Sequence, residues 1–356
     1  MKKRQRKLWQ LVGRDVDGLL ITSLANVRYL SGFSGTEGTL VLTRKEALFF
    51  TDGRYTTQAQ EQVSGYDVIT FTQKWKDIGR VLETHGIRML GVEARDLSVA
   101  LQQDLMQASP QVSLKLLTGE LDPLRVVKDS REITILRKAA LIAAESLQEV
   151  VPLIQPGIRE LELAAELEFR MRRKGGSEVS FQTIVASGVR SALPHGLASE
   201  KKIEKGDFVT IDYGLVYHGY SSDETCTFVV GRPTKKQLQV YDIVKQAHDR
   251  AIKAVRPGKK LKQVDLAARR LIDRAGYGNR FTHGTGHGVG LCVHEPPTVS
   301  FRSQERLCAG MVLTVEPGIY IPGWGGVRIE DTVVVTEQGS EYITRSDKTL
   351  TAVPIS

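Results

Sequence analysis

Several features are scarce in this sequence of 356 residues, and each scarcity narrows the possible classes of protein. Only three cysteines occur, Cys226, Cys292 and Cys308, and no two of them form a CxxC pair. This argues against a disulfide framework and a thiolate zinc site, so we expect reduced thiols. No apolar run approaches the roughly 20 residues that a membrane-spanning helix needs. The 33 glycines and 12 prolines follow no period, which excludes collagen-like and low-complexity chains.

The net charge of the chain is positive, with a formal value of +8, and five of the first seven residues are Lys or Arg. Basic surfaces bind nucleic acids by releasing counterions. Beyond the N-terminus, however, Lys and Arg are mixed with Asp and Glu, which is typical of a solvated surface, so we expect no nucleic-acid partner. Arg14, Asp15 and Asp17 interrupt the first apolar stretch, which excludes a secretory signal and predicts a cytoplasmic protein without a membrane partner.

The first third of the chain alternates between strand-like and helical patterns, which predicts a small α/β domain. The expected strands are short apolar or β-branched runs at residues 17–23, 38–43, 46–52 and 66–72. The expected helices are at residues 76–86 and 97–109. The pattern changes after Pro123, where Asp129 or Ser130 with Glu132 can cap a long helix. We therefore predict one domain at residues 1–126 and a second at residues 127–356.

The second domain contains an internal repetition, in which two helices are followed by a β-hairpin. The expected helices are residues 130–151, 158–174, 236–255 and 262–275. A strand-rich segment follows each helical pair, and the two halves share no obvious sequence identity. The predicted fold class is therefore α/β, more loosely α+β, with a pseudo-twofold repeat in the second domain.

Each hairpin carries two acidic residues at informative positions. If Asp212 pairs with Asp223, the turn falls at a Tyr-His-Gly sequence; if Glu316 pairs with Glu330, the turn centres on Gly323. Residues that oppose each other in antiparallel strands point to the same face, with β-carbons about 5 Å apart. Each acid taken singly is an ordinary strand-end or ion-pair residue. Four acids at the ends of apolar strands would repel one another, and a pair of divalent cations would remove that conflict.

Four of the seven histidines lie in segments rich in glycine or proline: His195, His283, His287 and His294. A single histidine is usually a surface or core residue, but four in one part of the chain indicate a site. The glycines around His283 and His287 favour a close-approach loop over a helix. They also suggest a phosphate cradle, but no GK[ST] sequence follows. Carboxylates combined with an imidazole favour Mn²⁺, Co²⁺, Fe²⁺ or Zn²⁺.

These residues lie in motifs of a known family. In chain order the motifs are IDYG, SSDETCT, HGTGHGVG, VHEPP, VEPGIY and VRIED. Their order and spacing closely resemble those of the metal-dependent Xaa-Pro peptidases, prolidase and aminopeptidase P, among the pita-bread-fold peptidases. The resemblance implies a pita-bread catalytic domain at residues 127–356, with two divalent metal ions per chain and a homodimer. The segments NVRYLSGFSG and LFFTDGRY make residues 1–126 similar to the smaller creatinase-type N-terminal domain.

The resemblance also implies the roles of individual residues. The matches to metal ligands are Asp212, Asp223, His287, Glu316 and Glu330, of which Asp223 and Glu330 would bridge the two ions. The matches to histidines that hydrogen-bond the substrate carbonyl or the reaction intermediate are His195 and His294. The matches to positions near the substrate are His283, Tyr320 and Arg328. A complete ligand set argues against the metal-free creatinases, and methionine aminopeptidases generally lack the extra N-terminal domain.

Hydrolysis of the peptide bond before proline is the predicted activity. Two ions roughly 3.5 to 4 Å apart, with Mn²⁺ favoured, would hold a bridging water and polarise the scissile carbonyl. Glu316 is the candidate general base, and His195 and His294 would stabilise the tetrahedral intermediate. We favour an Xaa-Pro aminopeptidase, which releases the N-terminal residue of a proline-containing peptide. An Xaa-Pro dipeptidase is the alternative, and a non-enzymatic binding protein on the same fold is a third, weaker one.

Overall fold

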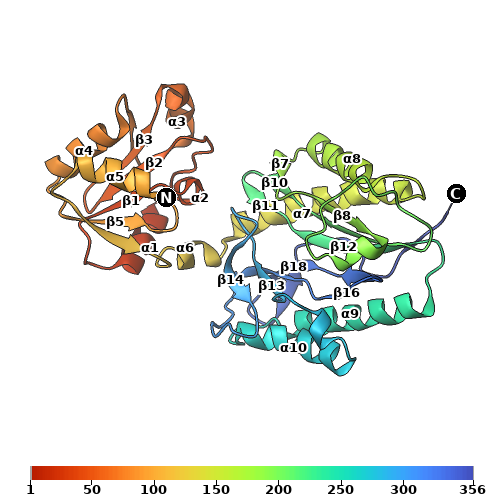
Figure 1. The fold of residues 1–356 in the computed structure, drawn as a ribbon. Helices are drawn as coiled ribbons and strands as arrows, with labels where there is room; N and C mark the ends of the chain where they lie inside the picture. Colours follow the sequence, from red (N-terminus) through yellow and green to blue (C-terminus); the bar gives the residue numbers. More distant parts are fainter. Residues whose placement is uncertain (1, 356) are drawn as a thin grey trace. The chain divides into compact units, whose positions relative to one another are not determined.

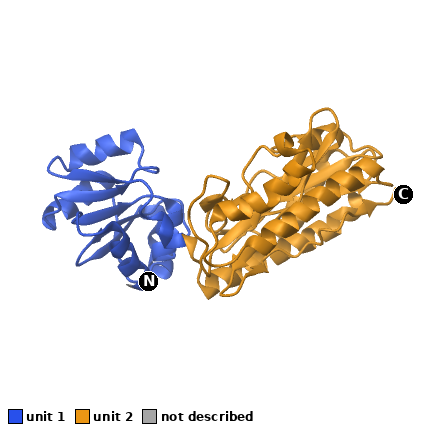
Figure 2. Ribbon diagram, turned by 90° about the horizontal axis from the view of Figure 1, so that it is seen from below, with its two compact units in different colours: residues 1–125 blue, residues 126–356 orange. Residues whose placement is uncertain are grey.

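The computed structural model describes residues 2–355, and the chain divides after Arg125 into two compact units (Figure 2). The sequence-based boundary after residue 126, and the functions assigned to the two parts, stay predictions. No helix within residues 2–355 is long and apolar enough to cross a membrane. The three cysteines form no disulfide within the described residues, and Cys226 is buried whereas Cys308 is exposed.

The first unit is built on a six-stranded mixed sheet with the strand order β4-β3-β2-β1-β5-β6 (Figure 1). Its strands are β1 (Gly18–Ile21), β2 (Thr39–Thr43), β3 (Ala47–Thr51), β4 (Asp67–Thr70), β5 (Met89–Glu93) and β6 (Ser113–Leu117). Its helices are α1 (Lys2–Val12), α2 (Leu24–Ser31), α3 (Thr56–Gln62), α4 (Lys74–Thr84), α5 (Val99–Ala108) and α6 (Asp122–Val126). The sequence predicted the first four strands, α4 and α5, and missed the remaining elements.

The basic N-terminus belongs to helix α1 and makes specific contacts within the first unit. Arg4 donates a hydrogen bond of 2.7 Å to the carbonyl oxygen of Tyr29 and lies 3.9 Å from the centre of that tyrosine ring. Lys7 donates to the carbonyl oxygen of Pro123 at 3.0 Å. Part of the positive charge therefore serves packing and helix capping inside this unit.

The second unit contains the four long helices that the sequence predicts. They are α7 (Ser130–Val150), α8 (Glu160–Arg173), α9 (Lys235–Ala254) and α10 (Leu261–Arg274). Helix α7 begins with a capping box in which Asp129 Oδ1 accepts from the Glu132 N–H at 2.9 Å, and Glu132 Oε2 accepts from the Asp129 N–H at 2.8 Å. Of the two expected caps, Asp129 is therefore the one used, and such a cap stabilises a helix by about 1 kcal/mol.

The strands of the second unit form several small sheets between the helices. The first half contributes β7 (Glu178–Val179), β8 (Ile184–Ser187), β9 (Phe208–Tyr213), β10 (Leu215–Tyr217), β11 (Tyr220–Ser221) and β12 (Glu224–Val230). The second half contributes β13 (Gly286–Gly288), β14 (Glu295–Val299), β15 (Val312–Val315), β16 (Gly318–Ile321), β17 (Gly325–Arg328), β18 (Asp331–Val335) and β19 (Ser340–Tyr342), with β20 (Ala352–Val353) near the C-terminus. The two main sheets have the orders β20-β12-β9-β8 and β14-β13-β15-β18-β19.

The helix pairs cover opposite sides of these strands (Figure 1). Along β9, Val209 and Ile211 belong to the apolar cluster formed with α7 and α8, whereas Phe208 belongs to the cluster formed with α9 and α10. The alternation follows from the two-residue period of a strand. Both helix pairs therefore pack on β9, which carries the candidate ligand Asp212 near its end.

The register of the second hairpin is the one predicted. Val315 pairs with Asp331 and Gly318 pairs with Arg328, which is the register for opposed Glu316 and Glu330. This expectation is confirmed.

The predicted pairing in the first hairpin is wrong. Asp212 pairs with Thr225, and Asp223 lies just outside β12. The reason is the position of the turn: Val216 pairs with Ser221 and Tyr217 pairs with Tyr220, so the hairpin centres one residue later than opposed Asp212 and Asp223 require. The turn consists of His218 and Gly219, inside the expected Tyr-His-Gly sequence, and both residues have the positive φ that a two-residue hairpin turn uses.

Candidate metal centre

The predicted ligands come from five separate places in the second unit, and four of them lie at strand ends. Asp212 is near the end of β9, Asp223 directly precedes β12, Glu316 directly follows β15 and Glu330 directly precedes β18. His287 is the central residue of β13. All five line one cavity of about 470 Å³.

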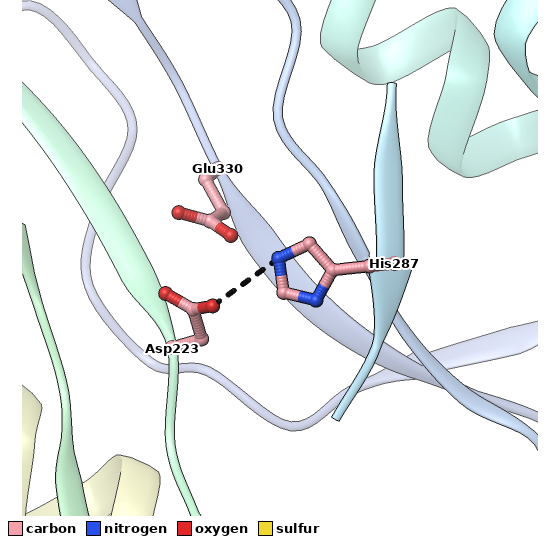
Figure 3. Close-up of side chains that lie close together, drawn as sticks. All are labelled: Asp223, His287 and Glu330. Atoms are coloured by element: carbon pink, nitrogen blue, oxygen red, sulfur yellow. Dashed lines mark ion pairs between the residues drawn. The ribbon is translucent and has the colours of Figure 1, made fainter. Parts of the chain in front are cut away.

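Three of these side chains form a compact cluster. The ligand atoms of Asp223, His287 and Glu330 all lie within 4.8 Å of one another, and the side chains point toward a common centre (Figure 3). The Nε2 atom of His287 is 3.5 Å from Asp223 Oδ2 and also 3.5 Å from Glu316 Oε1. The imidazole therefore lies between carboxylates from both hairpins.

Asp212 forms an ion pair with Arg328, which also lines the cavity. Its Oδ2 atom accepts a hydrogen bond of 2.7 Å from Arg328, whose side chain also donates to the carbonyl oxygen of Pro194 and to the Tyr320 hydroxyl. The other oxygen, Asp212 Oδ1, is buried and has no hydrogen-bond partner within residues 2–355. A buried carboxylate oxygen without a donor is costly, and a cation would satisfy it.

Burial strongly shifts the ionisation of these groups. Burial, together with the negative charge of Glu330, raises the pKa of Asp223 well above its usual range. Burial and the charge of Glu316 act in the same way on the pKa of Glu330. Burial, with a contribution from Asp212, raises the pKa of Glu316 to about 8. Burial lowers the pKa of His287 to about 4, so its ring is neutral at pH 7. Crowded carboxylates and a neutral imidazole are donors that fit divalent cations.

The backbone fixes the orientation of His287. Its Nδ1 atom lies 3.1 Å from the carbonyl oxygen of Gly288, and an N–H on Nδ1 leaves the lone pair of Nε2 facing the acids. The expected close-approach loop is instead the short strand β13. The glycines are still needed for close approach, since a Cβ atom at Gly286 or Gly288 would meet the carbonyl oxygens of Thr314 or Pro296.

The remaining predicted residues surround this cluster. The ring of His294 is 4.3 Å from that of His287, centre to centre, and His195 and His283 also line the cavity. His283 Nε2 lies 2.9 Å from the Tyr320 hydroxyl. Tyr320 is buried, and its hydroxyl contacts two residues that line the cavity, His283 and Arg328. The fold thus brings all of the predicted residues into one region.

Several supporting residues were missed from the sequence. The hydroxyl of Thr225 donates to Glu330 Oε2 at 2.7 Å, and strand alternation from Asp223 gives the signal that could have identified it. Arg269 on α10 donates to the carbonyl oxygen of His283 at 2.7 Å and pairs with the buried Asp265. The spacing of four residues between Asp265 and Arg269 predicts that pair, but no local signal points to its target loop.

A two-part α/β chain with carboxylates and imidazoles converging in a buried cavity has the features of a metal-dependent peptidase. Residues 134–337 match Metallopeptidase family M24, and residues 4–127 match the Creatinase/Prolidase N-terminal domain. The chain belongs to metallopeptidase family M24, and its second unit has the pita-bread fold of that family. It is therefore a metallopeptidase, and the predicted fold class and family resemblance are confirmed.

Similar proteins include both dipeptidases and an aminopeptidase. An Xaa-Pro dipeptidase of Pyrococcus furiosus is 40% identical over 98% of this chain and 100% of the relative. The structure of an Xaa-Pro dipeptidase from Bacillus anthracis has a TM-score of 0.96 and 42% identity, with 99% of both chains covered. The structure of an X-Pro aminopeptidase from Thermotoga maritima has a TM-score of 0.92 and 36% identity, covering 99% of this chain and 100% of that one.

Proposed function

We propose that this protein is an Xaa-Pro dipeptidase, which cleaves a dipeptide whose second residue is proline. The observation that carries the proposal is the cavity in which carboxylates of both hairpins converge with imidazoles, within a chain 40% and 39% identical to two archaeal Xaa-Pro dipeptidases. This choice replaces the aminopeptidase activity favoured from the sequence. The similarity to an X-Pro aminopeptidase keeps that activity as the second candidate.

The proposed cofactor is a pair of divalent cations, with Mn²⁺ favoured. Asp212, Asp223, His287, Glu316 and Glu330 would hold the pair, and the unpartnered Asp212 Oδ1 supports this assignment. When bound, such cations act as Lewis acids and lower the pKa of a shared water toward neutrality. The three atoms of the compact cluster and the His287–Glu316 approach give the donor set that this chemistry needs.

Glu316 is the proposed general base. Its carboxylate lines the cavity beside His287, so it can take a proton from the attacking water and deliver it to the leaving proline nitrogen. The imidazoles of His294 and His195 line the same cavity and would stabilise negative charge on the carbonyl oxygen. The peptide bond before proline carries no N–H, so recognition depends on the fit of the proline ring and on the carbonyl.

The proposed substrate pocket combines polar and apolar walls. Apolar side chains of Phe181, Ile184, Pro194 and Leu197 line the cavity on the side of the first hairpin. The volume of about 470 Å³ suits a small peptide, since ligand pockets usually measure about 300–1,000 Å³. The roles of His283, Tyr320 and Arg328 in substrate binding stay predictions.

Parallel assays on two substrates test the proposed function. Purified protein is supplied with Mn²⁺ and incubated with an Xaa-Pro dipeptide and, separately, with an Xaa-Pro-Xaa tripeptide of the same first residue. We expect cleavage of the dipeptide and little cleavage of the tripeptide. Preferential cleavage of the tripeptide would establish the aminopeptidase instead. Elemental analysis of the same preparation gives the number and identity of bound metal ions.

The oligomeric state and the cellular location of the protein stay predictions from the sequence. The expected homodimer is tested by sedimentation of the metal-loaded protein, in which a monomer at micromolar concentration would contradict it. The cytoplasmic location and the absence of a nucleic-acid partner also stay predictions.

A further inference from the structure

A lysine is buried in the second unit, close in sequence to none of the predicted ligands. The side chain of Lys348 is 6% exposed. Its Nζ atom lies 2.5 Å from Glu224 Oε1 and 3.5 Å from Asp331 Oδ1. A lysine is rarely buried unless its charge is paired, and here two acids share it.

The two acids that contact Lys348 occupy equivalent positions in the two hairpins. Glu224 directly follows Asp223, and Asp331 directly follows Glu330. Because successive side chains of a strand point to opposite faces, each of these acids lies on the face opposite its neighbouring candidate ligand. Lys348 therefore connects β12 with β18 on the face that points away from the candidate ligands.

Thr225 and Thr332 directly follow these two acids, and they also connect the two hairpins, on the strand face that carries Asp223 and Glu330. Thr225 donates through its hydroxyl to Glu330 Oε2 at 2.7 Å. Thr332 donates through its hydroxyl to the backbone carbonyl oxygen of Asp223 at 2.8 Å. In residues 223–225 and 330–332, the threonine of each triplet therefore hydrogen-bonds to the first acid of the other triplet. Lys348 contacts the second acid of both triplets.

This arrangement matters because β12 and β18 belong to different sheets. Strand β12 pairs with β9 and β20, and β18 pairs with β15 and β19. No strand ladder within residues 2–355 joins β12 to β18, so the spacing between Asp223 and Glu330 depends on cross-links between the sheets. These include the two threonine contacts, the hydrogen bond of 3.2 Å from the Glu330 N–H to the Thr225 carbonyl, the hydrogen bonds of Arg328 with Thr225 and Thr227, and the Lys348 bridge.

Further polar contacts surround the two acids that Lys348 bridges. Glu224 also accepts from the Tyr213 hydroxyl at 2.9 Å and from the Ser346 N–H at 3.0 Å. Asp331 also contacts His248 Nε2 at 3.2 Å and accepts from the Thr344 hydroxyl. Because the acids are held from several directions, the position of Lys348 is fixed, and its charge balances carboxylates that would otherwise repel each other.

We propose that Lys348 is a positioning residue for the metal centre: by bridging Glu224 and Asp331 from behind, it fixes the separation of Asp223 and Glu330 and thereby the binding of the cation pair. This inference rests on the proposed function, since it assumes that Asp223 and Glu330 hold cations. Lys348 has no contact with the cavity and takes no part in proton transfer.

The test is the variant Lys348→Met, assayed for Mn²⁺ binding by calorimetry and for dipeptide hydrolysis. We expect the affinity for Mn²⁺ and the kcat to fall by about tenfold or more, with KM nearly unchanged, as for other residues that orient metal ligands. The electron paramagnetic resonance signal of two coupled Mn²⁺ ions should weaken as well. The matched control is Ile272→Ala, a buried core change on α10, which we expect to lower stability and to leave the Mn²⁺ affinity unchanged.

A second variant separates loss of the bridge from simple misfolding. Lys348→Met combined with Glu224→Gln removes the bridge without leaving an extra buried charge, so it should fold even where the single variant does not. We expect the same weakening of Mn²⁺ binding in this double variant. Wild-type affinity, kcat and coupled signal in the folded double variant would overturn the inference alone. Failure of the wild-type protein to bind Mn²⁺ or cleave either peptide would instead overturn the proposed function.

Discussion

Arg328 and Asp212 form a buried ion pair, with Nη2 and Oδ2 2.7 Å apart, in the cavity that holds the other candidate ligands. The pair neutralises one acid while its second oxygen stays without a donor. The guanidinium also donates to the Thr225 hydroxyl and the Pro194 carbonyl oxygen. In the metal-free protein, Arg328 therefore connects Asp212 with Thr225 and with the backbone of Pro194.

Removal of this arginine should destabilise the metal-free protein strongly. In Arg328→Met the Asp212 carboxylate loses its partner, and breaking a buried pair in this way costs about 3–5 kcal/mol. Thermal unfolding in the presence of a chelator measures the loss, and added Mn²⁺ should restore part of the stability by binding only the folded state. The control is Arg159→Met, which breaks exposed pairs with Glu162 and Glu200 and should change the unfolding temperature little. Equal effects of the two variants would contradict the prediction.

Replacement of a candidate ligand should have the opposite effect on the metal-free protein. Asp223→Asn removes one of several mutually repelling buried carboxylates while keeping the size of the side chain, so the chelated variant should unfold at a higher temperature than the wild type. Bound metal and dipeptide cleavage should both be lost, as measured by elemental analysis and by the peptide assay. The control Asp249→Asn changes a half-exposed acid and should leave metal content and cleavage unchanged. A fully active, metal-free Asp223→Asn protein would refute the metal assignment.

The stability of the chelated protein should decrease as the pH rises from about 6.5 to about 8. Glu316 has a pKa of about 8 in the folded protein and an ordinary pKa of 4.5, so over this range the folded state keeps a proton that the unfolded state has lost. Stability then falls as the pH rises through the folded-state pKa. His287 and His283, each with a pKa of about 4, act in the opposite direction, but the effect is smaller because their unfolded rings are already about half deprotonated at pH 6.5.

Thermal unfolding of the chelated protein across this pH range measures the effect, which should be on the order of 1–2 kcal/mol. Glu316→Gln carries no titrating carboxyl group at this position, and its stability should vary less over the same range. Mn²⁺ should also flatten the profile of the wild type, because cation binding requires the ionised carboxylates. An unfolding temperature that is constant or rises from pH 6.5 to 8 in the chelated wild type would contradict this account.

The parts of the site that local patterns encode were predicted from the sequence, and the parts made by convergence were not. Helix α7 and its Asp129 cap follow from residues three apart, and the register opposite Glu316 follows from the position of Gly323. The pairing of Asp212 was wrong because the two turn residues are His218 and Gly219, one residue later than assumed, and a shift of one residue changes every pair along the hairpin.

Long-range contacts escaped prediction for a related reason. Arg328 is 116 residues from Asp212, and Lys348 is 124 residues from Glu224. Neither arginine nor lysine carries a sequence pattern that specifies which acid it will meet after folding. The family motifs supplied the set of cavity residues, but the ionic partners behind the cavity became visible only when the two sheets were placed together.

Removal of one cavity histidine should impair catalysis without emptying the metal centre. His294 lines the cavity and stacks edge-to-face on His287 at 4.3 Å, yet it lies outside the compact cluster of Asp223, His287 and Glu330. His294→Ala should therefore retain bound Mn²⁺, while kcat falls by about 10²–10³ because a donor to the developing negative charge is lost. His85→Ala in the first unit, where the imidazole pairs with Glu46, is the matched control and should keep full activity. If His294→Ala instead loses its metal and retains kcat after reloading, the residue binds cations rather than the reacting carbonyl.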